Sequence, residues 1–173
     1  VDGGARALAV FDVNQPPRIV WECINDLAAY PKMVPGVADV QVYAKSGAVT
    51  HAKYTIALMG YRLSYYLRYT YSASRQSAVF ELDYSKESDI DDTVGYWHVA
   101  PLDGGARSRV TYSAALLLKG WFPKPVIDFL LATTLGRATS WVGKEAAKRG
   151  GAPRAPRRGA WRKLWPFGRR RAK

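Results

Sequence analysis

Residues 61–71 read YRLSYYLRYTY, and five of these eleven residues are tyrosines. Large side chains occupy every odd position, namely Tyr61, Leu63, Tyr65, Leu67, Tyr69 and Tyr71. A period of two predicts a half-buried β-strand, with four aromatic rings and two leucines on one face. A buried phenol needs a partner for its hydroxyl, so this face is either an ordinary core or the lining of a cavity.

The positive charge of the chain is concentrated near its C-terminal end. The 173 residues carry a net charge of +12, but 11 of the 26 basic residues lie between Lys148 and Lys173, where there is no acidic residue. Residues 1–147 therefore hold 15 basic and 14 acidic residues and are almost neutral. The length and composition suit one globular domain. We predict a nearly neutral domain that is followed by a cationic tail.

Cysteine usage and hydropathy exclude several protein classes. Cys23 is the only cysteine, which excludes an internal disulfide and every multi-cysteine metal or redox motif. No run approaches the ~18 apolar residues that are needed to cross a bilayer. The chain begins at Val1 without an initiator methionine, which fits removal of a targeting segment and fits truncation equally. On the first interpretation we expect an imported protein of an organelle, a chloroplast or a mitochondrion.

Turn signals and periodicity predict a strand, a helical segment, six further strands and a long helix. Pro16 and Pro17 mark the start of the first helix, because proline suits a first helical turn. Short turns between consecutive strands are typical of an antiparallel meander. The expected strands are Ala5–Asn14, Val37–Lys45, Val49–Met59, Tyr61–Ser72, Ala78–Tyr84, Thr93–Ala100 and Arg109–Leu118, and the long helix is Val126–Lys148.

This order predicts an α+β fold in which a curved antiparallel sheet wraps around a long C-terminal helix. A strongly curved sheet leaves space between itself and the helix that covers it. The odd face of residues 61–71 and the even faces of the neighbouring strands would line that space. The candidate ligand-binding residues are Tyr54, Tyr65, Leu67, Tyr69, Phe80, Tyr96, His98 and Tyr112 from the sheet, and Phe129 and Leu130 from the helix.

The N-terminal part of the chain resembles a known group of proteins. Residues 13–42 read VNQPPRIVWECINDLAAYPKMVPGVADVQV, which is similar to the signature of START-like proteins of the polyketide cyclase/dehydrase and ubiquinone-binding branch. The residues that carry this resemblance are Pro16, Pro17, Val20, Trp21, Asp26, Leu27, Tyr30, Pro31, Pro35, Gly36 and Val37. The later segments YWHVAPLDGGARSRVTYSAAL and WVGKEAAKR also look similar. The resemblance implies a helix-grip fold with an apolar cavity, in a START-like domain over residues 1–149.

Few titratable residues fit a catalytic site. His98 shares a face with Tyr96 and, if that face is the inner one, is either a satisfied core histidine or a general base. His51 shares its face with Lys53 and is expected in water. The acidic run 87–92 lacks the spacing of a calcium loop and predicts a solvated hairpin tip. Because catalytic motifs such as GxSxG and HExxH are absent, we name no catalytic and no metal-binding residue.

The tyrosine face leaves three interpretations open. The rings could simply fill the core. They could also line a pocket for a quinone, a carotenoid or another lipid, which requires only an apolar enclosure and a few orienting hydroxyls. The resemblance also allows a cyclase or aromatase, in which Tyr65, Tyr69, Tyr112 and His98 would supply the polar groups. In none of the three is a covalent cofactor expected.

The cationic tail divides into two parts. Residues 150–160 are rich in Pro, Gly and Arg and predict an extended linker, and residues 161–173 form a basic aromatic segment. Tryptophan beside arginine is typical of a membrane interface, where each cation contributes about 1 kcal/mol on an anionic surface. Nucleic acid and an acidic protein surface are the competing partners. The candidate partner-binding residues are Trp161, Arg162, Lys163, Leu164, Trp165, Phe167, Arg169, Arg170 and Arg171.

These observations together predict a non-catalytic START-like protein that binds a hydrophobic ligand. Its tail would tether it to a membrane or to a membrane complex, as a peripheral membrane protein. One alternative is an accessory structural subunit, without ligand, of a large photosynthetic or respiratory membrane assembly or of a ribonucleoprotein assembly. The other alternative is an enzyme of the cyclase or aromatase type.

Overall fold

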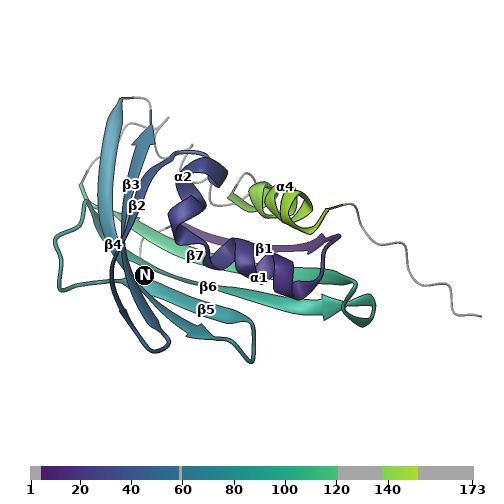
Figure 1. The fold of residues 1–173 in the computed structure, drawn as a ribbon. Helices are drawn as coiled ribbons and strands as arrows, with labels where there is room; N and C mark the ends of the chain where they lie inside the picture. Colours follow the sequence, from purple (N-terminus) through teal and green to yellow (C-terminus); the bar gives the residue numbers. More distant parts are fainter. Residues whose placement is uncertain (1–4, 59, 121–137, 152–173) are drawn as a thin grey trace, which may run out of the picture.

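The computed structural model describes residues 5–58, 60–120 and 138–151 of the chain (Figure 1). Its strands are β1 (Ala5–Val13), β2 (Val37–Ser46), β3 (Val49–Leu58), β4 (Tyr61–Ser72), β5 (Ser77–Leu82), β6 (Ile90–Leu102) and β7 (Arg107–Leu118). Its helices are α1 (Pro17–Asn25), η1 (Leu27–Ala29), α2 (Tyr30–Met33), η2 (Asp103–Gly105) and α4 (Ala138–Gly150).

All seven strands belong to one antiparallel sheet. Strands β2 to β7 follow one another as a meander, and β1 pairs with the free side of β7, which gives the order β1-β7-β6-β5-β4-β3-β2. The sheet is strongly curved, and α1, α2 and α4 lie against its concave side (Figure 1). The predicted α+β helix-grip fold is therefore confirmed.

Helix α1 begins at Pro17, as predicted, and turns one apolar face towards α4 and the sheet. Apolar residues three and four positions apart lie on one side of a helix, so a single stripe is buried. The buried residues are Val20, Cys23 and Ile24 in α1 and Trp141, Val142 and Ala146 in α4. These two helices complete the hydrophobic core above the concave face of the sheet.

The C-terminal end of α4 is bound to residues that flank both ends of α1, through a hydrogen bond and an ion pair. The Gln15 side chain donates a hydrogen bond of 2.9 Å from Nε2 to the carbonyl oxygen of Gly151. At the other end of α1, the Arg149 guanidinium lies 2.8 Å from the Asp26 carboxylate and also binds Glu145. Gln15 is itself held, because the Ser108 hydroxyl donates to its carbonyl oxygen at 2.7 Å.

Strand β4 has the alternation that residues 61–71 predict. Leu63, Leu67 and Tyr69 are buried on the concave face, whereas Arg62 and Arg68 are exposed on the other face. Each inner residue of β4 opposes an inner residue of the neighbouring strands, since directly paired residues point to the same side of a sheet. The tyrosine-rich face of β4 is therefore the concave face.

The prediction that Tyr96 and His98 line the cavity is wrong, because both side chains point away from the interior. The register pairs Trp97 with Tyr112 of β7 and with Ala78 of β5, so the odd residues of β6 face inward. Trp97 is 5% exposed, whereas Tyr96 is 39% exposed on the outer face. Both faces of this strand carry large side chains, so its own alternation does not decide which face is buried.

The long C-terminal helix is described only in part. The structure shows α4 from Ala138 to Gly150, whereas the sequence predicts a helix over Val126–Lys148. Residues 126–137, including Phe129 and Leu130, lie outside the described residues, as do residues 152–173 with all the candidate tail residues. The predicted division into domain, linker and tail therefore stays a prediction.

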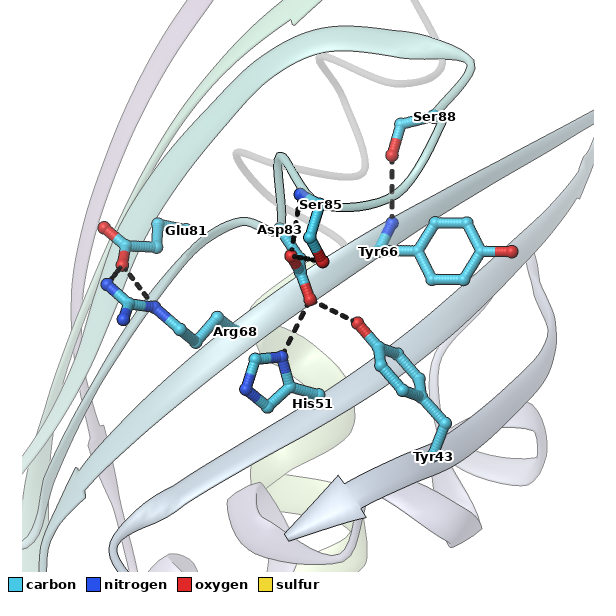
Figure 2. A network of polar contacts seen from close by, with 8 residues as sticks. All are labelled: Tyr43, His51, Tyr66, Arg68, Glu81, Asp83, Ser85 and Ser88. Carbon is cyan, nitrogen blue, oxygen red and sulfur yellow. Dashed lines mark hydrogen bonds and ion pairs between the residues drawn. The ribbon is translucent and has the colours of Figure 1, made fainter. Parts of the chain in front are cut away.

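An outer-face network centred on Asp83 ties the loop after β5 to the sheet (Figure 2). The Tyr43 hydroxyl of β2 donates to Asp83 Oδ2 at 2.6 Å, and His51 Nδ1 of β3 lies 2.8 Å from the same oxygen. The hydroxyl and backbone N–H of Ser85 bind the other oxygen. Burial alone would raise the pKa of Asp83, but the hydrogen bonds from Ser85, Tyr43 and His51 lower it overall. His51, expected in water, is thus half-buried and bonded to a carboxylate.

The loop that Asp83 anchors continues the pairing of β4 beyond the end of β5. The backbone N–H of Tyr66 donates to Ser88 Oγ at 3.2 Å, and that of Ser64 donates to Asp89 Oδ2 at 2.7 Å. Side chains of the acidic run therefore satisfy backbone groups that a strand would otherwise pair. This run is only partly the expected hairpin tip, since β6 already begins at Ile90.

Candidate ligand-binding cavity

A cavity of ≈ 170 Å³ lies between the concave face of the sheet and the helices. Strands β3, β4, β5, β6 and β7 supply most of its wall, and α2 with the turn that follows and α4 close it. The described lining residues are Tyr30, Val34, Pro35, Val37, Tyr54, Ile56, Leu63, Tyr65, Leu67, Tyr69, Phe80, Ile90, Thr93, Trp97, Tyr112, Ala114, Leu116, Leu118 and Trp141. This wall is mostly apolar and aromatic.

Aromatic rings contact one another around much of this cavity. Tyr54 stacks on Tyr65 with ring centroids 5.4 Å apart, and Tyr69 lies 5.7 Å from Phe80. Across β6 and β7, Trp97 lies 4.1 Å from Tyr112. Rings packed in this way restrict one another's rotamers, which favours a wall that is already formed before a ligand binds.

Three of the cavity tyrosines already have hydrogen-bond partners within the protein. Tyr54 and Tyr69 share a buried hydrogen bond of 2.8 Å between their hydroxyls. The Tyr30 hydroxyl donates to the carbonyl oxygen of Ile24 at 2.7 Å. These hydroxyls are satisfied, so their role is to fix the shape of the wall.

The hydroxyls of two other cavity tyrosines, Tyr65 and Tyr112, have no hydrogen-bond partner within the described ranges. Neither hydroxyl is a fully buried atom. Both side chains line the cavity, Tyr65 from β4 and Tyr112 from β7. They are the polar groups that a molecule inside the cavity could reach.

Burial keeps these phenols neutral. Desolvation raises the pKa of Tyr65 and of Tyr112 above the ordinary tyrosine value, and for Tyr65 the nearby Tyr112 adds to the effect. Desolvation also raises the pKa of Tyr30, Tyr54 and Tyr69. At physiological pH the cavity thus presents neutral O–H groups, which donate hydrogen bonds but do not act as bases.

Charged side chains are missing from the part of the cavity wall that the structure describes. The only other described lining residue with a hydroxyl group is Thr93, and this hydroxyl donates to the carbonyl oxygen of Ala115 at 2.8 Å. Likewise, no three His, Cys, Asp or Glu side chains of the described chain come close enough together to hold a metal ion. The described wall suits an uncharged molecule, because a buried charge needs a partner.

The sequence predicted the inner tyrosines better than the remaining wall. Of the candidates, Tyr54, Tyr65, Leu67, Tyr69, Phe80 and Tyr112 line the cavity, and their binding role stays a prediction. Sequence reasoning missed Tyr30, Trp97 and Trp141, although Tyr30 lies in the N-terminal motif and Trp141 in the predicted helix. Trp97 was missed because Tyr96 and His98 on the other face of its strand are also large, and only the pairing with Ala78 and Tyr112 identifies the inner face.

No helix of the described residues is long and apolar enough to cross a membrane. This finding concerns only helices, and the candidate tail residues lie outside it. The predicted contact of the tail with a membrane therefore stays a prediction.

Comparisons with solved structures find the same fold in distant proteins. A protein from Thermus thermophilus has a TM-score of 0.68 at 18% identity, over 87% of this chain and 100% of that one. The Zhui aromatase/cyclase from Streptomyces sp. R1128 has a TM-score of 0.68 at 13% identity, over 85% and 93% of the two chains. A START superfamily protein from Mycobacterium smegmatis has a TM-score of 0.64 at 14% identity, over 86% and 97%.

A comparison with family models identifies the family of this chain. No curated protein matches the sequence. The model described as polyketide cyclase / dehydrase and lipid transport matches residues 13–139, which is most of the chain. The resemblance to the ubiquinone-binding branch remains a prediction. This match agrees with the helix-grip sheet and with the cavity under the helices. The chain belongs to the polyketide cyclase / dehydrase and lipid transport family.

Proposed function

We propose that this protein binds a neutral hydrophobic molecule without transforming it. The observation that carries the proposal is the pair of unpartnered hydroxyls, Tyr65 and Tyr112, in an otherwise apolar part of the described cavity. Both hydroxyls can donate a hydrogen bond, so we expect a ligand that carries an acceptor such as a carbonyl or ether oxygen. Because neither hydroxyl is fully buried, a ligand acceptor would replace a hydrogen bond to water with one inside a mostly apolar wall, which should contribute about 0.5–1.5 kcal/mol for each hydroxyl.

The size of the cavity restricts the part of the ligand that it can enclose. An apolar protein cavity of about 150 Å³ accommodates benzene, so ≈ 170 Å³ is enough for a single substituted ring. A quinone head group combines such a ring with two carbonyl acceptors on opposite sides. Among the expected ligands, the head group of a quinone therefore fits the described cavity better than a carotenoid, whose long polyene is far larger than this volume.

Catalysis is the second candidate, because an aromatase/cyclase is among the structural neighbours. Acid–base chemistry at neutral pH needs a group whose pKa lies near 7. The described wall offers only phenols, whose pKa values burial raises further. His98, the one histidine considered as a base, points away from the cavity. These observations favour binding over catalysis.

The experiment compares two molecules of similar shape, of which one carries hydrogen-bond acceptors. Duroquinone and durene have the same tetramethylated six-carbon skeleton, but only duroquinone carries carbonyl oxygens. We expect the full-length protein to bind duroquinone more tightly, and Tyr65→Phe with Tyr112→Phe to weaken it about tenfold while durene binding stays unchanged. Calorimetric titration measures both affinities. Equal binding of the two molecules by the native protein would reject the hydroxyl pair as the recognition element.

A separate proposal concerns the tail, which would attach the protein to an anionic membrane. It rests on the sequence of residues 161–173, where three large aromatic residues, Trp161, Trp165 and Phe167, lie among six cations. Vesicles with and without anionic lipid, sedimented with the full-length protein, test it. We expect binding only to anionic vesicles, and its loss with Trp161→Ala and Trp165→Ala. If the native chain stays unbound, the docked-subunit alternative, which needs no ligand, gains support.

A further inference from the structure

A second hollow lies on the concave side, beside the C-terminal half of α1. It is a groove of ≈ 610 Å³ between the C-terminal half of α1 with η1 on one side and the ends of β2, β3 and β4 on the other. Its described lining residues are Trp21, Asn25, Asp26, Leu27, Ala28, Val42, Lys45, Gly47, Ala48, Thr50, Tyr71 and Ala73. The proposed function does not involve this groove.

One side of the groove contains an amide with no partner. The Oδ1 atom of Asn25 is buried and has no hydrogen bond. In the described part of the chain, nothing accepts from its nitrogen either. Exchanging the two amide atoms would not change this, because neither position has a partner among the described residues. A buried amide atom without a hydrogen bond is costly unless something outside the protein binds it.

The groove also carries a free cation. Lys45 pairs with the buried Thr50 in the β2–β3 register, so both side chains are on the concave face. Within residues 5–58, 60–120 and 138–151, no carboxylate forms an ion pair with Lys45. Among the described lining residues the only acidic one is Asp26, and its carboxylate is already engaged by Arg149 at 2.8 Å. The charge left without a partner in the described part of this groove is therefore positive.

The rest of the groove wall is apolar or aromatic. Val42 is 48% exposed although it lies on the concave face, so the groove leaves a large part of this side chain uncovered. Trp21 and Tyr71 meet edge to face with centroids 6.2 Å apart. The hydroxyl of Tyr71 has no hydrogen-bond partner among the described residues. An apolar wall with a few polar groups at its edge is the usual composition of a ligand site.

We infer that this groove is a second binding site, whose ligand is an amphiphilic organic anion. The acid group of the ligand meets Lys45, its apolar body lies against Val42, Trp21 and Tyr71, and its polar atoms can pair with the Asn25 amide. The cavity by contrast has no charged wall residue among those described and takes a neutral molecule. Tyr71 stacks on Tyr69 at 5.7 Å, so this pair of rings separates the two sites.

Two fluorescent probes test the inference on the full-length protein. The probe 1-anilinonaphthalene-8-sulfonate carries an anionic group, whereas N-phenyl-1-naphthylamine has the same ring system without it. We expect Lys45→Glu to weaken the sulfonate probe about tenfold and to change the neutral probe less than about twofold. Lys45 is exposed, so its replacement leaves the fold intact.

Controls separate this groove from general surface charge and from the cavity. Lys53→Glu makes the same charge change on the next strand and on the outer face, and should leave the affinity for the sulfonate probe within about twofold. Duroquinone, the cavity probe, should not displace the sulfonate probe. The second site would be rejected if the two lysine variants lost the same affinity for the sulfonate probe, or if neither lost any. Displacement of this probe by duroquinone would also reject it.

Discussion

Tyr65 and Tyr66 are neighbours in the sequence but lie in opposite environments. Tyr65 faces the cavity, where it stacks on Tyr54, and desolvation raises its pKa. Tyr66 faces outward, where the Lys53 ammonium lies 5.7 Å from its ring centroid and its ring edge meets Tyr43. Two consecutive residues of one strand thus lie in an aromatic cavity wall and beside a lysine on the outer face.

The difference shows how the same side chain is stabilised in two ways. On the concave face phenols pair with one another, as Tyr54 and Tyr69 do at 2.8 Å. On the outer face the phenol of Tyr43 pairs with a carboxylate, Asp83, at 2.6 Å. Inner pairs are neutral and independent of pH in the physiological range, whereas outer pairs depend on an ionised group. Substitutions on the two faces test this distinction.

The largest effect is expected where the inner face is most tightly packed, at Gly95 of β6. A Cβ atom there would lie 2.3 Å from Phe80 Cζ and 2.2 Å from the Ser113 carbonyl oxygen. Gly95→Ala should therefore lower the free energy of unfolding by about 3 kcal/mol. Urea denaturation measures this loss. The control is Gly143→Ala in α4, where no described atom lies within 4 Å of the added Cβ, and it should stabilise by about 0.5–1 kcal/mol.

The outer network gives the next largest effect. Asp83→Asn removes the charge that Tyr43, His51 and Ser85 bind, and should lower the free energy of unfolding by about 2 kcal/mol at pH 7. Asp91→Asn is the matched control, because Asp91 is exposed on β6 and has no partner among the described residues. If both variants lose the same stability, the network of Figure 2 contributes nothing specific.

The same substitution should also change how stability depends on pH. The pKa of Asp83 is lowered in the folded state from its ordinary value of 3.8, so its stabilising effect is present above about pH 4. As the pH falls below this value, the unfolded state binds a proton first and the contribution is lost. The difference between the native protein and Asp83→Asn should shrink steadily from about pH 5 to about pH 3 in urea denaturation experiments. A constant difference would contradict the assignment.

The inner hydroxyl pair should have a smaller and non-additive effect. Tyr54→Phe leaves the Tyr69 hydroxyl buried without its partner, and should lower the free energy of unfolding by about 1–2 kcal/mol. The double variant with Tyr69→Phe removes both hydroxyls and should cost no more than the single one. Thermal unfolding of Tyr54→Phe, Tyr69→Phe and the double variant completes this double-mutant cycle. Additive losses would mean that the two hydroxyls do not depend on each other.

The smallest effect is expected at Tyr66 on the outer face. Tyr66→Phe keeps the ring that Lys53 and Tyr43 contact and removes only a hydroxyl for which the described structure shows no partner. Stability should change by less than about 0.5 kcal/mol. Comparing this variant with Tyr54→Phe in one denaturation series measures the contrast between the two faces directly. An equal loss from both would remove the distinction between the two faces.

The sequence predicted β4 because one face of this strand is consistently apolar and the other consistently polar. Leu63, Leu67 and Tyr69 alternate with Arg62 and Arg68, so only one face can be buried. The start of α1 at Pro17 was predicted because proline suits the first turn of a helix. Where each residue of an element supports one assignment, local pattern determines local structure.

Strand β6 could not be oriented in the same way, because both of its faces carry large residues. Its orientation is set by the pairing of Trp97 with Ala78 and Tyr112, which is a tertiary property. The hydrogen bonds between cavity tyrosines could not be predicted for the same reason. The spacing of Tyr54 and Tyr69 in the sequence does not show that their hydroxyls meet. The Asp83 network was missed because its members come from β2, β3 and the loop after β5 (Figure 2).

The fastening of α4 has a mechanical consequence. Gln15 holds Gly151 before the start of α1, and Arg149 holds Asp26 after its end. Gly150 leaves no room for a larger residue there, because a Cβ would lie 2.0 Å from Gln15 Oε1. A force applied to α4 at Gly151 would therefore act on α1 as well, so the two helices that cover the concave face would resist displacement together.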